Sequence, residues 1–254
     1  MTQRTEQTAE RVSTVLARWD EVTAVGLTTH GEDVYDPYLS LSFDVYVRDD
    51  VREPGERERS FGEVTAFESS ILTNKDRFLV GSMPVRLEYK HTDRYDELVG
   101  AALRGECALR DAGTYAFRRV VDARVLVSHD EWLESVRASL AKLPGSFWSR
   151  LRYAQEATVE HLYADVSAAA MRDDAFYFVA TAGSFLTQLC ALLFTVNRRF
   201  EPSPRSIHGE VLALPVIPDS FPANLDNFVD QEHQLSMSQR RELAELMVRS
   251  VLSL

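Results

Sequence analysis

Apolar and polar side chains alternate almost without a break along residues 37–50 of the chain. Apolar residues occupy every second position, and the polar row between them includes Ser42, Asp44 and Tyr46. A period of two predicts a half-buried β-strand with one apolar and one polar face. The pattern therefore places one carboxylate, that of Asp44, on the polar face of a strand, two residues after a serine.

Patterns of the same kind predict the elements around this strand. Residues 84–91 also alternate, with Arg86, Glu88 and Lys90 on the polar side. The apolar stretch at 22–27 and the stretch at 120–130 are typical of strands. Helices are predicted over 5–20, 63–71, 93–104 and 130–142, the last with Asp130 as its N-cap, and an exposed loop is predicted over 52–63.

The pattern changes near Pro144. Long helical periodicities cover 147–171, 175–198 and 238–252, and the proline-containing stretch at 212–222 is predicted to be irregular. The chain therefore divides into a mixed α/β domain, residues 1–143, and an all-helical domain, residues 144–254. The expected fold class is α+β, with a small mixed sheet followed by a helical bundle.

Charge and cysteine content narrow the function classes. The chain has 28 basic and 39 acidic residues and a net charge of −11, which disfavours long nucleic acid as a partner. A small phosphorylated ligand is compatible with this charge, because one cleft can concentrate a few cations. Cys107 and Cys190 are expected to be packing residues, since neither lies in a CxxC motif, and no Cys/His cluster indicates zinc.

The N-terminal segment and the most apolar segment of the chain indicate where the protein is located in the cell. The N-terminal sequence MTQRTEQTAERV is polar and has no signal-peptide pattern. The most apolar run, residues 185–196, contains a glutamine and is too short to span a bilayer. We therefore expect a cytoplasmic protein with no membrane partner.

The order of these features resembles the polymerase-beta-like nucleotidyltransferase superfamily. In that superfamily a Gly-Ser pair ends the first strand, two acidic residues one apart lie on the second strand, and a third lies on a later strand. Gly26 matches the glycine, Asp44 matches the second acidic position, and Glu88 is the candidate for the third. The resemblance covers residues 5–142, and LFTVNRRFEPSPRS at 193–206 is similar to a stretch of the helical substrate-binding domain that often follows.

The resemblance implies a transfer of a nucleoside monophosphate from a nucleoside triphosphate to a hydroxyl of a small-molecule acceptor. Asp44 and Glu88 would be the catalytic residues and would hold Mg²⁺. Gly26, Ser42 and Arg205 would contact the nucleotide, with the Gly26 backbone close to the phosphates.

Two departures from the family pattern affect this chemistry. Leu27 stands where the family has a serine, and Ser42 stands where the first carboxylate is expected. A hydroxyl is a poorer Mg²⁺ ligand than a carboxylate.

Each candidate also has a purely structural interpretation. Asp44 is equally compatible with a solvated strand residue, Gly26 with a tight turn, and Glu88 with a surface ion pair to its polar neighbours. His30 and Asp33 could contact a phosphate or only solvent.

The second domain has candidates of its own. Trp148 and Tyr153 are expected to be packing residues rather than a base-stacking platform. Arg198 and Arg199 are explained by a helix C-terminus, whereas Arg205, after two prolines, is a candidate phosphate or substrate contact.

Two functions are open on these residues. The first is a Mg²⁺-dependent nucleotidyltransferase, and the second is a catalytically degenerate relative that binds a nucleotide or a protein partner. Ser42 and Leu27 favour the second, and a homo-oligomer is compatible with both. An unrelated α/β domain whose alternating strands coincide by chance is the third hypothesis.

Overall fold

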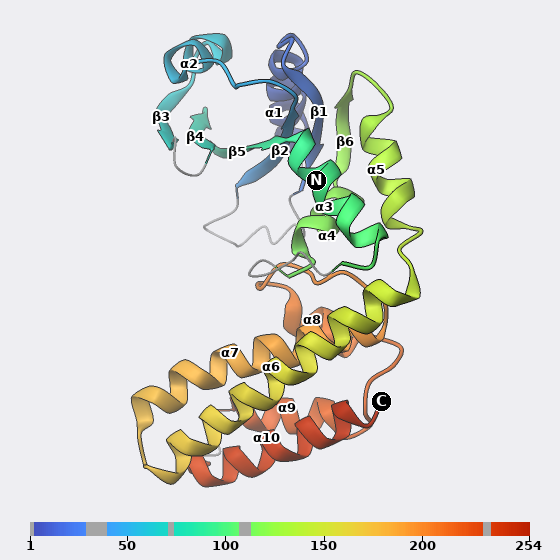
Figure 1. The fold of residues 1–254 in the computed structure, drawn as a ribbon. Coiled ribbons are helices and arrows are strands. Elements are labelled where there is room, and N and C mark those ends of the chain that lie inside the picture. The colour runs from blue at the N-terminus through green and yellow to red at the C-terminus, as the bar shows by residue number, and fades with distance from the viewer. Residues whose placement is uncertain (1–2, 29–39, 71–73, 107–112, 231–234) are drawn as a thin grey trace. The chain divides into compact units, whose positions relative to one another are not determined.

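The computed structural model describes residues 3–28, 40–70, 74–106, 113–230 and 235–254. The chain forms two compact units (Figure 1). The sheet unit comprises residues 1–103 and 119–142, and the helical unit comprises residues 104–118 and 143–254. The fold is α+β, as the sequence predicts. The helical unit therefore includes a segment, 104–118, that the sequence pattern placed in the first domain.

The elements of the sheet unit follow the chain from α1 to α5. They are α1 (Gln3–Leu16), β1 (Val22–Leu27), β2 (Leu41–Val47), α2 (Pro54–Phe61), β3 (Thr65–Ser70), β4 (Lys75–Val80), β5 (Met83–His91), α3 (Thr92–Leu103), β6 (Arg124–Ser128) and α5 (Trp132–Leu140). Helix α4 (Tyr115–Asp122) contains the point where the chain passes from the helical unit back to the sheet unit, between Arg118 and Arg119.

Six strands of the described residues form one mixed sheet, in the order β3-β4-β5-β2-β1-β6. Strands β2 and β5 pair in parallel, and the other neighbouring strands pair antiparallel. Both strands alternate as predicted, so each presents an apolar row to one face and a polar row to the other. The apolar face packs against α1 and α2, through buried residues such as Trp19, Phe43 and Leu87.

A buried polar network lies within this apolar face. Arg57 of α2 donates to both carboxylate oxygens of Asp76 on β4, at 2.8 and 2.9 Å, and the Tyr89 hydroxyl donates to Asp76 Oδ2 at 2.7 Å. The Asp76 side chain is fully buried and that of Arg57 is 9% exposed. Because each charge is paired and hydrogen-bonded, the network can be buried without leaving an uncompensated ion.

The prediction for residues 52–71 was wrong. Residues 54–61 form helix α2 rather than a loop, and residues 65–70 form strand β3 rather than a helix. Strand β4 was not predicted. The charged residues of α2 suggested exposure, but Arg57 turns inward to Asp76, and that partner comes from a distant part of the sequence.

Several other boundaries differ from the prediction. Residues 120–122 belong to α4, so strand β6 begins only at Arg124, and α5 begins at Trp132, whose N–H donates to Asp130 Oδ1 at 2.9 Å. The stretch at 212–222, predicted to be irregular, overlaps two helices at its ends: residue 212 is the last of α8 (Ile207–Leu212), and residues 221–222 are the first two of α9 (Phe221–Val229).

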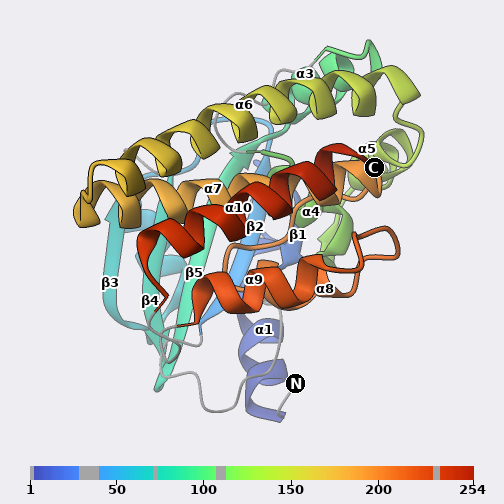
Figure 2. The same cartoon turned by 90° about the horizontal axis from the view of Figure 1, so that it is seen from below.

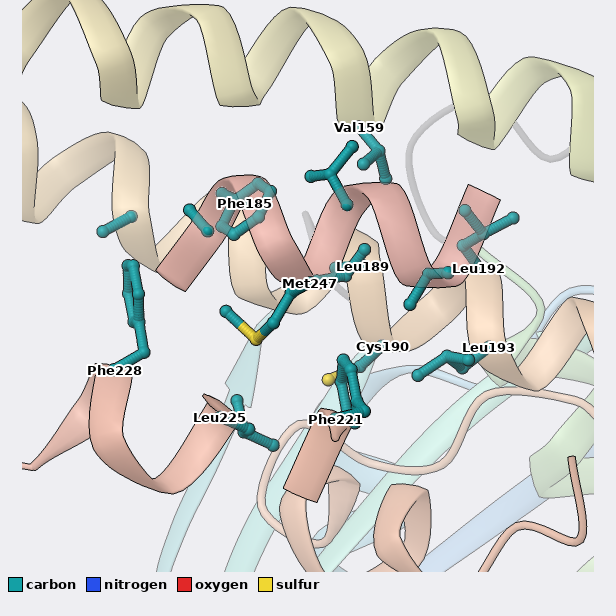
Figure 3. Close-up of a cluster of buried hydrophobic side chains, with 14 of the residues drawn as sticks. Val159, Phe185, Leu189, Cys190, Leu192, Leu193, Phe221, Leu225, Phe228 and Met247 are labelled. Carbon is teal, nitrogen blue, oxygen red and sulfur yellow. The ribbon is translucent and has the colours of Figure 1, made fainter. Parts of the chain in front are cut away.

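The helical unit is built on a long hairpin. Its further helices are α6 (Gly145–Met171), α7 (Ala175–Val196), α8 (Ile207–Leu212), α9 (Phe221–Val229) and α10 (Met237–Leu252). Figure 2 shows α10 running beside α6 and α7. Phe185, Leu189 and Met247 are fully buried in the core between these helices (Figure 3). Burial of this apolar face is what holds the helices together.

Helix α7 contains the apolar run of residues 185–196. The helix has 22 residues, and its most apolar window has a mean hydropathy of 1.7, so its length and composition meet the requirement for a membrane span. However, 56% of that window is buried against the other helices, as in the core helix of a soluble bundle.

Residues 113–118 are anchored to the rest of the helical unit through Glu201. Its Oε1 atom accepts hydrogen bonds from the backbone N–H and the hydroxyl of Thr114, both at 3.3 Å, and from Gln155 Nε2 at 3.4 Å. Burial raises the pKa of Glu201, and the hydrogen bonds from Thr114 and Gln155 oppose that rise. Phe117, on the same segment, packs edge-on against Phe200.

Candidate functional site

The parallel pairing of β2 and β5 brings two predicted site residues together. Asp44 and Glu88 are directly opposite one another across the two strands, and Ser42 is opposite Arg86. All four alternate with core residues, so their side chains project from the face of the sheet away from the apolar core. The expectation that Asp44 and Glu88 share one sheet surface agrees with this register.

The Asp44 carboxylate is fully buried and is held by two cations. Arg119 of α4 donates from Nε to Asp44 Oδ2 at 2.9 Å and from Nη2 to Asp44 Oδ1. Lys90 Nζ lies 3.0 Å from Asp44 Oδ2. A bidentate guanidinium–carboxylate contact is among the strongest polar contacts in proteins, and here water does not weaken it.

Arg119 is further positioned by the end of β1. Its Nη2 donates to Thr28 Oγ1 at 3.1 Å, and the Thr28 N–H and hydroxyl in turn donate to the Ser42 carbonyl oxygen, at 2.8 and 3.1 Å. Sequence reasoning missed Arg119. Its only signal is an arginine pair on a short amphipathic segment, and such pairs are common on exposed helices.

Glu88 is bound less tightly than Asp44. Its side chain is 27% exposed, and its Oε2 atom lies 3.8 Å from both Lys75 Nζ and Arg119 Nη2. The hypothesis of an ion pair therefore fits the geometry, although the partners are Lys75 and Arg119 rather than the sequence neighbours Arg86 and Lys90.

Aromatic side chains pack next to Asp44 on the polar face of the sheet. Tyr46 follows Asp44 on the same polar row and contacts Tyr95 and Trp132, with ring centroids 5.4 and 5.1 Å away. Burial raises the pKa of Tyr46 well above its usual value, and the Asp44 charge raises it further. Burial also lowers the pKa of Lys90, with Asp44 acting in the opposite direction. Asp44 thus lies in the buried part of the polar face.

These residues do not fit a Mg²⁺ site. Both oxygens of Asp44 already accept from Arg119, and Lys90 lies where a further cation would approach. A divalent ion prefers several oxygen ligands, and the described residues contain no group of three or more His, Cys, Asp or Glu residues that could hold a metal ion. The positive charges of Arg119 and Lys90, next to the same carboxylate, would repel a divalent cation.

Gly26 lies on β1 opposite Asp44. A Cβ atom at this position would lie 2.8 Å from the Ala123 Cβ atom, so the glycine allows Ala123 to pack closely against β1. Leu27, at the position of the family serine, is 5% exposed and belongs to the apolar core. These contacts give both residues a packing role.

The remaining predicted residues lie elsewhere. Arg205 belongs to the helical unit, where its side chain is exposed and its N–H donates to Ser203 Oγ at 3.3 Å. Trp148 stacks on Phe200 with ring centroids 5.5 Å apart, as expected of a packing residue, whereas Tyr153 is 77% exposed. His30, Asp33 and Cys107 lie outside the described residues.

Comparisons with known proteins agree with the fold. A family model described as a domain of unknown function (DUF4037) matches residues 112–205, less than half of the chain. No curated protein matches. A solved structure, of a nucleotidyltransferase-like protein from Exiguobacterium sibiricum 255-15, is 14% identical and has a TM-score of 0.51, covering 98% of this chain and 74% of that one. This chain therefore has a nucleotidyltransferase-like fold.

Proposed function

We propose that this chain is a nucleotidyltransferase-like protein that binds a nucleotide without carrying out metal-dependent transfer. One observation carries the proposal: Arg119 and Lys90 hold the buried Asp44 carboxylate. Asp44 stands at the position of a metal ligand in the nucleotidyltransferase superfamily that the sequence resembles. Two-metal transfer needs carboxylates that are available to cations. In this chain, Arg119 and Lys90 already pair with the Asp44 carboxylate.

The substitution at residue 42 supports the same proposal. Ser42 removes one of the three carboxylates of the family pattern, and the remaining two, Asp44 and Glu88, both have Arg119 within 4 Å. The positive charges that would come from Mg²⁺ in an active relative are thus supplied by side chains. A nucleotide bound here would not need a metal ion to offset Asp44 and Glu88.

A second candidate function is transfer of a nucleoside monophosphate to a hydroxyl of a small-molecule acceptor. The directly opposed positions of Asp44 and Glu88 favour it. It requires Arg119 and Lys90 to release the Asp44 carboxylate.

The two candidates are separated by ATP titration, with melting temperature as the readout, once in EDTA and once in excess Mg²⁺. Binding to the folded state raises the melting temperature by mass action. We expect the same rise in both buffers. A parallel assay with α-labelled triphosphate and a panel of hydroxyl acceptors should give no transfer by the wild type.

The outcomes that contradict the proposal are specific. A melting shift that appears only with Mg²⁺, together with transfer that disappears in Asp44→Asn, would establish the enzymatic candidate. Absence of any ATP-dependent shift in both buffers would contradict nucleotide binding. Circular dichroism of Asp44→Asn shows whether the variant is folded.

A further inference from the structure

Two arginines face one another on the polar side of the sheet. Arg77 of β4 is the direct partner of Arg86 of β5 in the antiparallel pairing. Their neighbours along each strand, such as Phe78 and Leu87, are buried in the core, so both arginines project from the opposite face. Directly opposite residues on neighbouring strands lie about 5 Å apart at Cβ. The sheet thus places two arginine side chains next to each other at their Cβ atoms.

The nearby carboxylates do not neutralise this pair. Asp44 is held by Arg119 and Lys90, and Glu88 lies between Lys75 and Arg119. Within the described part of the chain, neither Arg77 nor Arg86 has a side-chain hydrogen bond or ion pair.

In the described part of the sheet, Glu68 of β3 is the third carboxylate in this row. It is the strand partner of Arg77, but the two side chains form no ion pair within the described residues. Arg77 is exposed and Arg86 is half-buried, so both can be reached from solvent. Among the residues that the structure describes, the pair therefore has no counterion.

Such an arrangement is costly without an anion. Like charges directly opposite one another on neighbouring strands destabilise a sheet. Among the described residues of β2, β3, β4 and β5, together with Arg119 of α4, this part of the polar face has five cations (Lys75, Arg77, Arg86, Lys90 and Arg119) and three carboxylates (Asp44, Glu68 and Glu88). A net positive face on a chain of net charge −11 is a local feature that overall composition hides.

We infer that Arg77 and Arg86 form an anion site that takes the phosphate chain of a nucleotide without a metal ion. Two arginines on neighbouring strands can each bind phosphate oxygens bidentately, and together they can bind the successive phosphates of a di- or triphosphate. Arg86 is also opposite Ser42, which places the site next to Asp44 on the same sheet face. This inference rests on the proposed nucleotide binding and assigns the residues that hold the phosphates.

The test uses the full chain and two ligands, sodium tripolyphosphate and ATP, titrated by calorimetry in EDTA. The variant Arg77→Gln/Arg86→Gln removes both charges and keeps most of the side-chain length. We expect at least a tenfold loss of affinity for both ligands, because charge-assisted contacts to phosphate are lost. The matched control, Arg18→Gln/Arg59→Gln, removes two exposed arginines near α1 and α2 and should bind like the wild type.

A second variant tests the sign of the charge effect. Glu68→Gln removes the carboxylate opposite Arg77 and should tighten tripolyphosphate binding by about two- to fivefold. The site is disproved if the wild type does not bind tripolyphosphate, or if Arg77→Gln/Arg86→Gln binds either ligand as tightly as the wild type. Transfer activity by the wild type would contradict the proposed function and leave the arginine result as it stands, so the two failures are distinguishable.

Discussion

Arg119 donates to both carboxylate oxygens of Asp44, from Nε to Oδ2 at 2.9 Å and from Nη2 to Oδ1, and the Asp44 side chain is fully buried. The contact links residues 75 positions apart in the sequence. It pairs with a protein cation the carboxylate that the nucleotidyltransferase pattern would assign to a metal ion.

Removing Arg119 should destabilise the sheet unit strongly. Arg119→Ala leaves Asp44 buried with Lys90 as its remaining cation, and breaking a buried pair costs about 3–5 kcal/mol. Urea denaturation measures the free energy of unfolding. The double variant Asp44→Asn/Arg119→Ala should lose less than the sum of the two single variants, because both act on one contact. Additive losses would show that the contact contributes little.

Substituting Gly26 should destabilise through crowding. Gly26→Ala places a Cβ atom 2.8 Å from the Ala123 Cβ atom, and overpacking of this kind costs about 1–3 kcal/mol. Ala123→Gly in the same chain removes the clash and should restore part of the loss. Failure of Ala123→Gly to restore stability would mean that Gly26 serves something other than this packing contact.

We expect the hydroxyl of Tyr89 to contribute to the stability of the fold and that of Tyr46 to contribute little. Tyr89→Phe removes a 2.7 Å hydrogen bond to the buried Asp76 carboxylate and should cost about 2 kcal/mol. Tyr46→Phe is the matched control, because the Tyr46 hydroxyl is buried with no hydrogen-bond partner among the described residues. Thermal unfolding of both variants, measured side by side, checks the difference. Equal losses would contradict the network.

Glu201 should make stability depend on pH. Burial raises its pKa in the folded state, so the folded chain holds this proton more tightly than the unfolded chain. The contribution is full below the unfolded value of about 4.3 and is lost as pH rises through the raised folded pKa. Glu201→Gln, which can still accept from Thr114, should remove this slope in unfolding curves between pH 4 and 8. A slope identical to the wild type would contradict the assignment.

The strands that carry the site could be predicted, because their signal is local. Alternation alone gives β2 and β5 and the face on which Asp44 and Glu88 lie. The long periodicities likewise predict α6, α7 and α10. In each case the residues that determine the structure are neighbours in sequence.

The parts that could not be predicted depend on distant partners. Helix α2 is charged and short, and its inward arginine is explained only by Asp76, nineteen positions later. Arg119 reaches Asp44 from a short helix that sequence periodicity did not indicate. The opposition of Arg77 and Arg86 depends on strand register, and β4 was not recognised as a strand.

The division of the chain into two units determines which fragments keep their contacts and the order in which contacts can form during synthesis. Because residues 104–118 belong with residues 143–254, a fragment that starts after Lys142 would lack Thr114 and Phe117. Glu201 would then keep only Gln155, and Phe200 only Trp148, of the partners described above. On the ribosome, the segment 104–118 emerges long before its helices exist. Phe117 therefore cannot pack against Phe200 until the C-terminal part of the chain has been made.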